Sequence, residues 1–115
     1  MALNDIERKR VENTVGAYIQ KHRPPPHIRP ELDLGFRVKG QSVEIFEIRP
    51  VWKEPQKKME QPVAKATFVR TSATWKIYWL RADLKWHRYE PQPMVGTIEK
   101  FLATVEEDRY ACFWG

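Results

Sequence analysis

Apolar side chains near the N-terminus recur about every 3.6 residues, which places them along one stripe of an α-helix. The stripe consists of Ile6, Val11, Val15, Tyr18, Ile19 and His22. Asn4 is a favourable N-cap, and Glu7 follows at capping-box spacing. The run Pro24-Pro25-Pro26 lacks backbone donors and must end the helix. The pattern therefore predicts one amphipathic helix ahead of the prolines.

From Leu32 onward the period changes to two, which is typical of a strand with one buried face. Gly40-Gln41 has the residue order of a two-residue hairpin turn. The turn fixes which residues lie opposite one another, and the resulting pairs match in polarity. These pairs are Val38 with Val43, Phe36 with Ile45, Arg37 with Glu44, and Gly35 with Phe46.

The remainder of the chain predicts a loop, three more strands and a closing helix. Prolines mark the polar stretch 53–62 as the longest loop. Strands are predicted at residues 63–70, 74–80 and 85–89, and a helix over residues 96–107. Short connections favour an antiparallel sheet with helices against it. The predicted fold is a single α+β domain over residues 1–115. Its five-stranded antiparallel sheet, a hairpin plus a three-strand meander, is flanked by an N-terminal and a C-terminal helix.

Composition narrows the class of protein without naming a function. The 115 residues fit one domain, and a hydrophobic content of 42% can build a single core. No apolar run approaches the roughly 20 residues of a spanning helix, and no hydrophobic signal stretch opens the chain. Cys112 is the only cysteine, so an internal disulfide cannot form. We therefore expect a cytoplasmic protein with no membrane partner.

Positive charge gathers in one part of the chain. The net charge is +5, and residues 61–90 carry six Lys or Arg against two acidic residues, a balance of +4. Alternation along the predicted meander places a cationic and aromatic set on the face away from the core. This set is Lys65, Lys76, Tyr78, Lys85, His87 and Tyr89. Lysine neutralises phosphate and rings stack on bases, so the set predicts a surface for nucleic acid or another anionic ligand. An ordinary solvated sheet face explains the same pattern.

A second basic segment follows the first predicted helix. Arg23, His27 and Arg29 lie in and around the proline run, where a polyproline-like turn would hold them ready for a carboxylate or phosphate. The alternative interpretation is a rigid connection whose arginines pair with acidic residues of the same chain. The candidate acids are Asp33, Glu44 and Glu47.

The sequence carries no recognisable catalytic motif. Its three His and one Cys show no metal-ligand spacing, its five Gly are scattered, and nothing marks a serine or Cys112 as an activated nucleophile. We predict no catalytic residue, no metal site and no cofactor. One alternative remains, a metal-dependent phosphodiester hydrolase built from carboxylates and a lysine. Its candidate residues are Asp33, Glu44, Glu47, Asp83 and Lys85.

Three segments add a resemblance. PPPHIRP at residues 24–30, EIRPVW at 47–52 and WLRADLKWHRYEP at 79–91 occur in this order. Together they resemble a family of short bacterial proteins classified as a domain of unknown function (three-zero-two-four in that series). The resemblance implies a bacterial, single-domain, intracellular protein, with relatives among mobile gene cassettes, including integrons. It assigns no activity, ligand or site residue.

These observations favour a non-enzymatic binding module for an anionic partner, with nucleic acid preferred. The second expectation is a protein-interaction module, including a homodimer, because five Trp and four Tyr are many for so short a chain.

Overall fold

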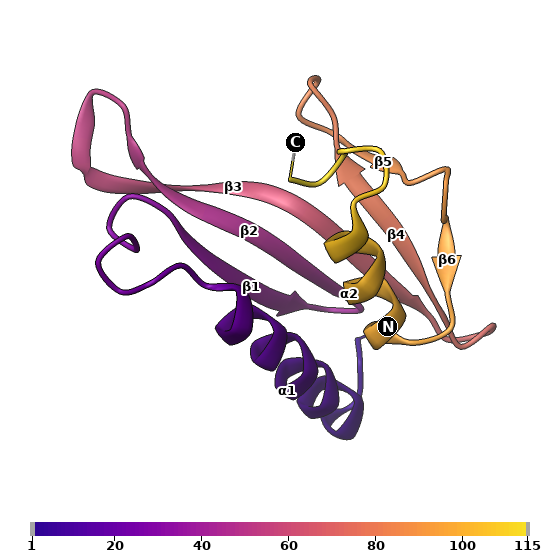
Figure 1. Ribbon diagram of the computed structural model, residues 1–115. Helices are drawn as coiled ribbons and strands as arrows, with labels where there is room; N and C mark the ends of the chain where they lie inside the picture. The colour runs from indigo at the N-terminus through magenta and orange to yellow at the C-terminus, as the bar shows by residue number, and fades with distance from the viewer. Residues whose placement is uncertain (1, 115) are drawn as a thin grey trace.

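The computed structural model describes residues 2–114, which form one sheet with both helices on the same face (Figure 1). In chain order the elements are α1 (Asp5–His22), β1 (Asp33–Lys39), β2 (Ser42–Val51), β3 (Glu54–Val69), β4 (Thr74–Leu80), β5 (Trp86–Arg88), β6 (Met94–Val95) and α2 (Ile98–Glu107). Strands β1 to β5 pair antiparallel in chain order, and the short β6 also pairs with β4. The predicted α+β fold is confirmed, with β6 as an addition. No helix within residues 2–114 is long and apolar enough to cross a membrane.

Helix α1 begins at the predicted capping box. The Asn4 side chain accepts from the Glu7 amide at 2.8 Å, and the Glu7 carboxylate accepts from the Asn4 amide at 3.0 Å. Val11 lies on the buried stripe, but Ile6 is 83% exposed, so its assignment to the stripe is wrong. The two residues are five apart and therefore about 140° apart around the helix axis, which turns Ile6 toward solvent.

The hairpin of β1 and β2 has the predicted register, including Phe36 opposite Ile45 and Arg37 opposite Glu44. Gly40 lies at the turn with φ of +61°, a backbone conformation that glycine adopts without strain. Gly35 leaves room for a ring on the opposite strand, because a Cβ there would lie 2.7 Å from the Phe46 side chain.

Strands β2 and β3 extend well beyond the rest of the sheet. The prediction of a loop at residues 53–62 is wrong, because β3 begins at Glu54 and pairs with β2 almost to the tip. Two register shifts interrupt the pairing, one between Ile45 and Phe46 and one between Pro50 and Val51. Pro62, opposite Phe46, and Pro50 both lie at these irregularities, where strands tolerate proline. Paired strands can therefore form in a stretch whose sequence pattern predicts a loop.

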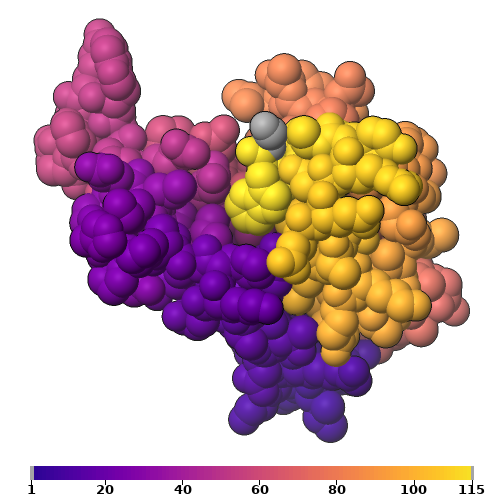
Figure 2. Space-filling view, in the orientation of Figure 1, coloured from indigo at the N-terminus to yellow at the C-terminus, as the bar shows by residue number. Residues whose placement is uncertain are grey.

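The hydrophobic core lies between the helices and one face of the sheet. Its fully buried members come from both layers: Val15, Val43, Ile45, Ala64, Ala66, Ile77, Phe101 and Val105. Figure 2 shows the N-terminal helix and the C-terminal segment covering this side of the molecule, with the β2–β3 extension standing apart. On the opposite face of the sheet, here called the outer face, no helix of residues 2–114 packs (Figure 1).

The C-terminal residues are tied to the end of α2. The helix begins at Ile98, two residues later than predicted, because Thr97 supplies the N-cap. Asp108 closes it in a left-handed conformation with φ of 41°. The Asp108 carboxylate accepts from the amides of Phe113 and Trp114 at 3.0 and 2.9 Å. Asp108 thus holds the chain that follows against the C-terminal end of α2.

Candidate functional site

The outer face presents a row of cations and rings across β3, β4 and β5. Cross-strand register places Lys65 beside Tyr78, Tyr78 beside Arg88, and Leu80 beside Trp86. Ala64, which precedes Lys65, is fully buried against the helices. Because successive side chains of a strand point to opposite faces, Lys65 and its neighbours lie on the outer face.

Lys65 is held between two aromatic rings. Its Nζ lies 5.4 Å from the ring centroid of Tyr78 and 5.5 Å from that of Trp86. Both distances are within the range of cation–π attraction. The rings restrain the ammonium without neutralising it, and Tyr78 and Trp86 are themselves partly exposed. This arrangement keeps a positive charge and two ring surfaces available on the same face.

Positive charge dominates the outer face. Its cations are Arg37, Lys39, Lys58, Lys65, Lys76 and Arg88, and its acids are Asp33, Glu44 and Glu60. Glu60 is paired with Arg37, whose guanidinium also lies 4.7 Å above the Phe46 ring. Within residues 2–114, no acidic oxygen lies within 4.0 Å of the charged nitrogens of Lys65, Lys76 or Arg88. Three cations of this face are therefore free to meet an external anion.

The predicted surface is only partly reproduced. Lys65, Lys76 and Tyr78 lie on the outer face, as predicted. His87 and Tyr89 do not, because His87 is opposite Trp79 and the Tyr89 amide donates to Ile77, both on the helix side. Their places on the outer face are taken by Trp86 and Arg88, which sequence reasoning had not assigned to this surface.

The error has a simple origin in the β4–β5 connection. The prediction used the four residues 81–84, whereas the loop has five, 81–85, with Leu84 at a φ of 62°. A slip of one residue moves every side chain of a strand to the other face. Lys85 consequently lies in the turn, exposed, and not on the strand.

On the helix side, Tyr89 is a core residue and His87 is tied to the turn. Tyr89 is 2% exposed and packs on Phe113 at a ring distance of 4.7 Å. Burial raises the pKa of its hydroxyl. The His87 Nε2 lies 2.8 Å from a carboxylate oxygen of Asp83, and this hydrogen bond lowers the pKa of Asp83. Neither side chain can belong to an outer-face site.

The second basic segment is engaged within the chain. Arg23 binds Asp33 through two hydrogen bonds of 2.8 and 2.7 Å, which lowers the pKa of Asp33. The Arg29 Nε donates to the Pro24 carbonyl at 2.9 Å, and His27 is exposed. These contacts favour the interpretation of a rigid connection between α1 and β1.

The carboxylates proposed for a hydrolase are dispersed. Asp33 is bound to Arg23, and Glu44 lies beside Lys65 on the outer face. Glu47 lies on the helix side, 3.2 Å from the guanidinium of Arg49. Within residues 2–114, no three His, Cys, Asp or Glu side chains are grouped closely enough to hold one metal ion. The candidate carboxylates therefore do not converge on one site within the part of the chain that the structure describes.

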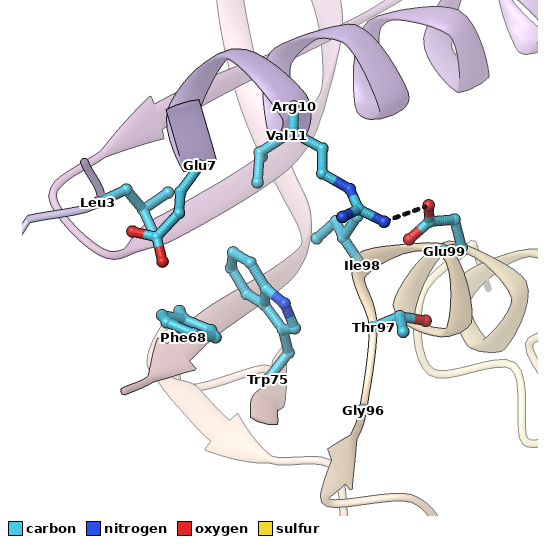
Figure 3. Close-up of a pocket in the computed structure, with 10 residues that line it drawn as sticks. All are labelled: Leu3, Glu7, Arg10, Val11, Phe68, Trp75, Gly96, Thr97, Ile98 and Glu99. Atoms are coloured by element: carbon cyan, nitrogen blue, oxygen red, sulfur yellow. Dashed lines mark ion pairs between the residues drawn. The ribbon is translucent and has the colours of Figure 1, made fainter. Parts of the chain in front are cut away.

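A hollow on the helix side lies between the N-terminal ends of α1 and α2 (Figure 3). It measures about 210 Å³, and Trp75 and Phe68 form its apolar floor. Arg10 reaches across to Glu99 at 3.7 Å, as the dashed line in Figure 3 shows. The volume is below the 300 Å³ or so at which small-molecule sites begin. Its other acid, Glu7, is paired with Arg70 at 2.9 Å, so we interpret the hollow as the seam between the two helices.

A second hollow, of about 360 Å³, lies where α1 and the end of α2 approach β1 and β2. Its acids each have a basic neighbour: Glu106 is 3.6 Å from His22, and Glu47 is paired with Arg49. Burial raises the pKa of Tyr18 to about 12, so its hydroxyl stays neutral there. Both acids of this hollow therefore already have a neighbour within the same chain.

Comparisons with known proteins identify a family. No curated protein sequence and no solved structure matches the chain. The sequence profile of a family described as a domain of unknown function, DUF3024, matches residues 3–115. Because the match spans nearly the whole chain and agrees with the resemblance of its three motif segments, this protein belongs to the DUF3024 family.

Proposed function

We propose that this protein is a non-enzymatic binding module whose outer face binds single-stranded nucleic acid. The observation that carries the proposal is the lysine held between two partly exposed rings, Lys65 with Tyr78 and Trp86. Bases stack on such rings at about 1–3 kcal/mol each, and the neighbouring cations neutralise phosphates. An uncovered antiparallel sheet face provides the flat platform that a splayed strand requires.

The assigned contacts differ in role. Lys65, Lys76 and Arg88 meet phosphates, because they lie on the three strands around the two rings and, within residues 2–114, have no acidic partner within 4.0 Å. Tyr78 and Trp86 stack on bases. A single strand is favoured over a duplex because rings on a flat sheet reach base faces only where those faces are unpaired.

The test is fluorescence anisotropy of labelled single-stranded and duplex oligonucleotides, titrated across a salt series. The variant K65Q/K76Q/R88Q removes three phosphate contacts. It should reduce the slope of log affinity against log salt by about 2, at roughly 0.7 per contact for a single strand. Thermal unfolding of the variant establishes that the fold is intact.

A matched control removes the same charge from the helix side. Lys9, Lys21 and Lys100 are exposed on α1 and α2, so K9Q/K21Q/K100Q changes net charge equally without touching the outer face. Its salt slope should stay close to that of the unmodified protein. Equal slopes for all three proteins would remove the outer face as the binding surface.

A further inference from the structure

The composition of the β2–β3 extension does not suggest a role in the folded core. We call residues 49–61 the arm. Every residue from 52 to 62 is exposed, and the arm projects away from the helices and the rest of the sheet (Figures 1 and 2). A two-stranded ribbon without a packed face is only marginally stable in water. The arm therefore buries little surface in return for the ordering that it requires.

A tryptophan occupies the tip of this arm. Val51 is opposite Glu54, so Trp52 and Lys53 form the turn, and Trp52 is 86% exposed. The Lys53 Nζ lies 5.5 Å from the Trp52 ring centroid. Turns are ordinarily formed by small or polar residues. The Trp52 indole is instead a large apolar group that no other part of residues 2–114 buries. Its exposure is what a ring that meets an external surface requires.

The charge around the tip points to the chemistry of that surface. Residues 52–58 contain Lys53, Lys57 and Lys58 against Glu54, a balance of +2. Lys57 lies 3.3 Å from Glu54 with both side chains at least half exposed, a pair of the kind that contributes little and exchanges readily. The combination of a ring with an adjacent lysine repeats the chemistry of the outer face, where Lys65 lies between rings. Complementarity therefore favours a polyanion with stackable groups.

The arm and the outer face are parts of one continuous strand. From Lys65 to Glu54 there are eleven steps along β3, and at about 3.3 Å each they span at most about 36 Å. Between the two places the nucleotides stack on one another and advance about 3.4 Å each, so a strand of about ten nucleotides covers the same distance. One ligand of that length can reach both places.

We propose that the arm is a second contact site for the same single strand, in which Trp52 stacks on an unpaired base about ten nucleotides from the segment on the outer face. Lys53 neutralises the adjoining phosphate. The inference rests on the proposed function, to which it adds a minimum ligand length and a residue far from the first site.

Two oligonucleotide lengths separate the contributions. An oligothymidylate of about five nucleotides can occupy the outer face but cannot reach the arm, whereas one of about 20 nucleotides can do both. For the long probe, W52A should weaken binding by about 5- to 150-fold, the equivalent of losing one base–aromatic stack. For the short probe, W52A should bind as the unmodified protein does. W52F keeps a stacking ring and should recover most of the affinity for the long probe.

A control variant accounts for the loss of an exposed apolar side chain as such. Ile6 is 83% exposed on α1, and I6A should leave affinity for both probes unchanged. Because Trp52 is almost entirely in solvent, W52A should unfold at the same temperature as the unmodified protein. Its effect on affinity then comes from the contact and not from the fold.

The outcomes distinguish this inference from the function on which it rests. If the unmodified protein binds both probes and W52A binds them equally well, the arm is not a contact site, while the outer-face proposal stands. If the unmodified protein binds neither probe at low salt, the proposed function itself fails. A W52A loss of the same size for both lengths would contradict the spacing. Capture of a protein partner through Trp52 without any nucleic-acid effect would overturn the inference in favour of an assembly role.

Discussion

Strands β2 and β3 together have an inner half, packed under the helices, and an outer half, the arm. The two halves differ in burial. In the inner half, Ile45 and Ala64 face each other across the strands and are fully buried under the helices. In the arm, Arg49 and Met59 are paired by the same backbone ladder, but both are exposed. Antiparallel pairing resumes beyond the register shift between Ile45 and Phe46, whereas burial does not extend along the arm. Backbone pairing thus sets the shape of both halves, and hydrophobic burial sets the stability of only one.

The comparison also explains why the residues assigned to binding lie outside the core. Residues of the inner half that face the helices are constrained by packing, since core positions respond to changes of a single methylene. Apart from the close contact of Gly35 with Phe46, the outer face and the arm carry no such constraint. The rings and lysines assigned to binding lie there, at Lys65, Tyr78, Trp86 and Trp52.

The largest contrast should appear in amide hydrogen exchange. The Ile45 amide lies in the most buried part of the sheet and should be protected up to the global free energy of unfolding, about 5–15 kcal/mol. Arm amides near Met59 should open with several kcal/mol less, because opening them exposes little apolar surface. Equal protection in the two halves would contradict the division.

Truncating a side chain in each half sharpens the comparison. I45A should reduce the free energy of unfolding by about 2–5 kcal/mol, since it leaves a cavity in a fully buried site. M59A, on the arm and 46% exposed, should change it by no more than about 0.5 kcal/mol. Urea titration of both variants provides the measurement, and comparable losses would show that the arm packs more tightly than its exposure indicates.

A smaller loss of stability is expected at Gly35, which the Phe46 ring of the opposite strand approaches closely. In G35A the new Cβ would lie 2.7 Å from the Phe46 ring, which must move from beneath Arg37. We expect a loss of about 1–3 kcal/mol by chemical unfolding. Gly96 has open space at the corresponding position, so G96A is the matched control and should be nearly neutral. A stable G35A protein would mean that the ring shifts without cost.

The smallest effect concerns the link between α1 and β1. The hydrogen bonds from Arg23 lower the pKa of Asp33 in the folded state relative to the unfolded chain. A carboxylate with a lowered folded pKa contributes stability that is present above its unfolded pKa, about 3.9, and is lost as pH falls through the folded value. Unfolding measured from about pH 6 to pH 2 should therefore show a steeper acid loss for the unmodified protein than for D33N. Parallel curves would show that this carboxyl does not contribute.

The predictable parts of the fold are those in which several local signals agree. The β1–β2 hairpin combines a glycine turn, alternating polarity and an Arg37–Glu44 pair, and its register is confirmed. The arm lacks all of these signals: both of its faces meet water, so no alternation marks it, and Pro50 and Pro55 suggest a loop. Hydrophobic alternation depends on burial, so a pair of strands with both faces exposed gives little periodic signal in the sequence.

The candidate site shows the same limit. Lys65, Lys76 and Tyr78 could be assigned because β3 and β4 alternate clearly. Trp86 and Arg88 were missed because β5 has only three residues and its face depends on the length of one turn. For Trp52, the available signal was a large aromatic residue within a polar, proline-marked stretch, which composition alone does not separate from a loop.

The register shift between Ile45 and Phe46 gives the arm the mechanics of a lever. A bulge is a point where a ribbon bends and twists with its remaining hydrogen bonds intact. The nine steps from Val63 to Glu54 make a lever of about 30 Å, so a tilt of about 10° at its base displaces the tip by about 5 Å. A small rotation beside the core thus becomes a displacement of more than one nucleotide spacing at Trp52.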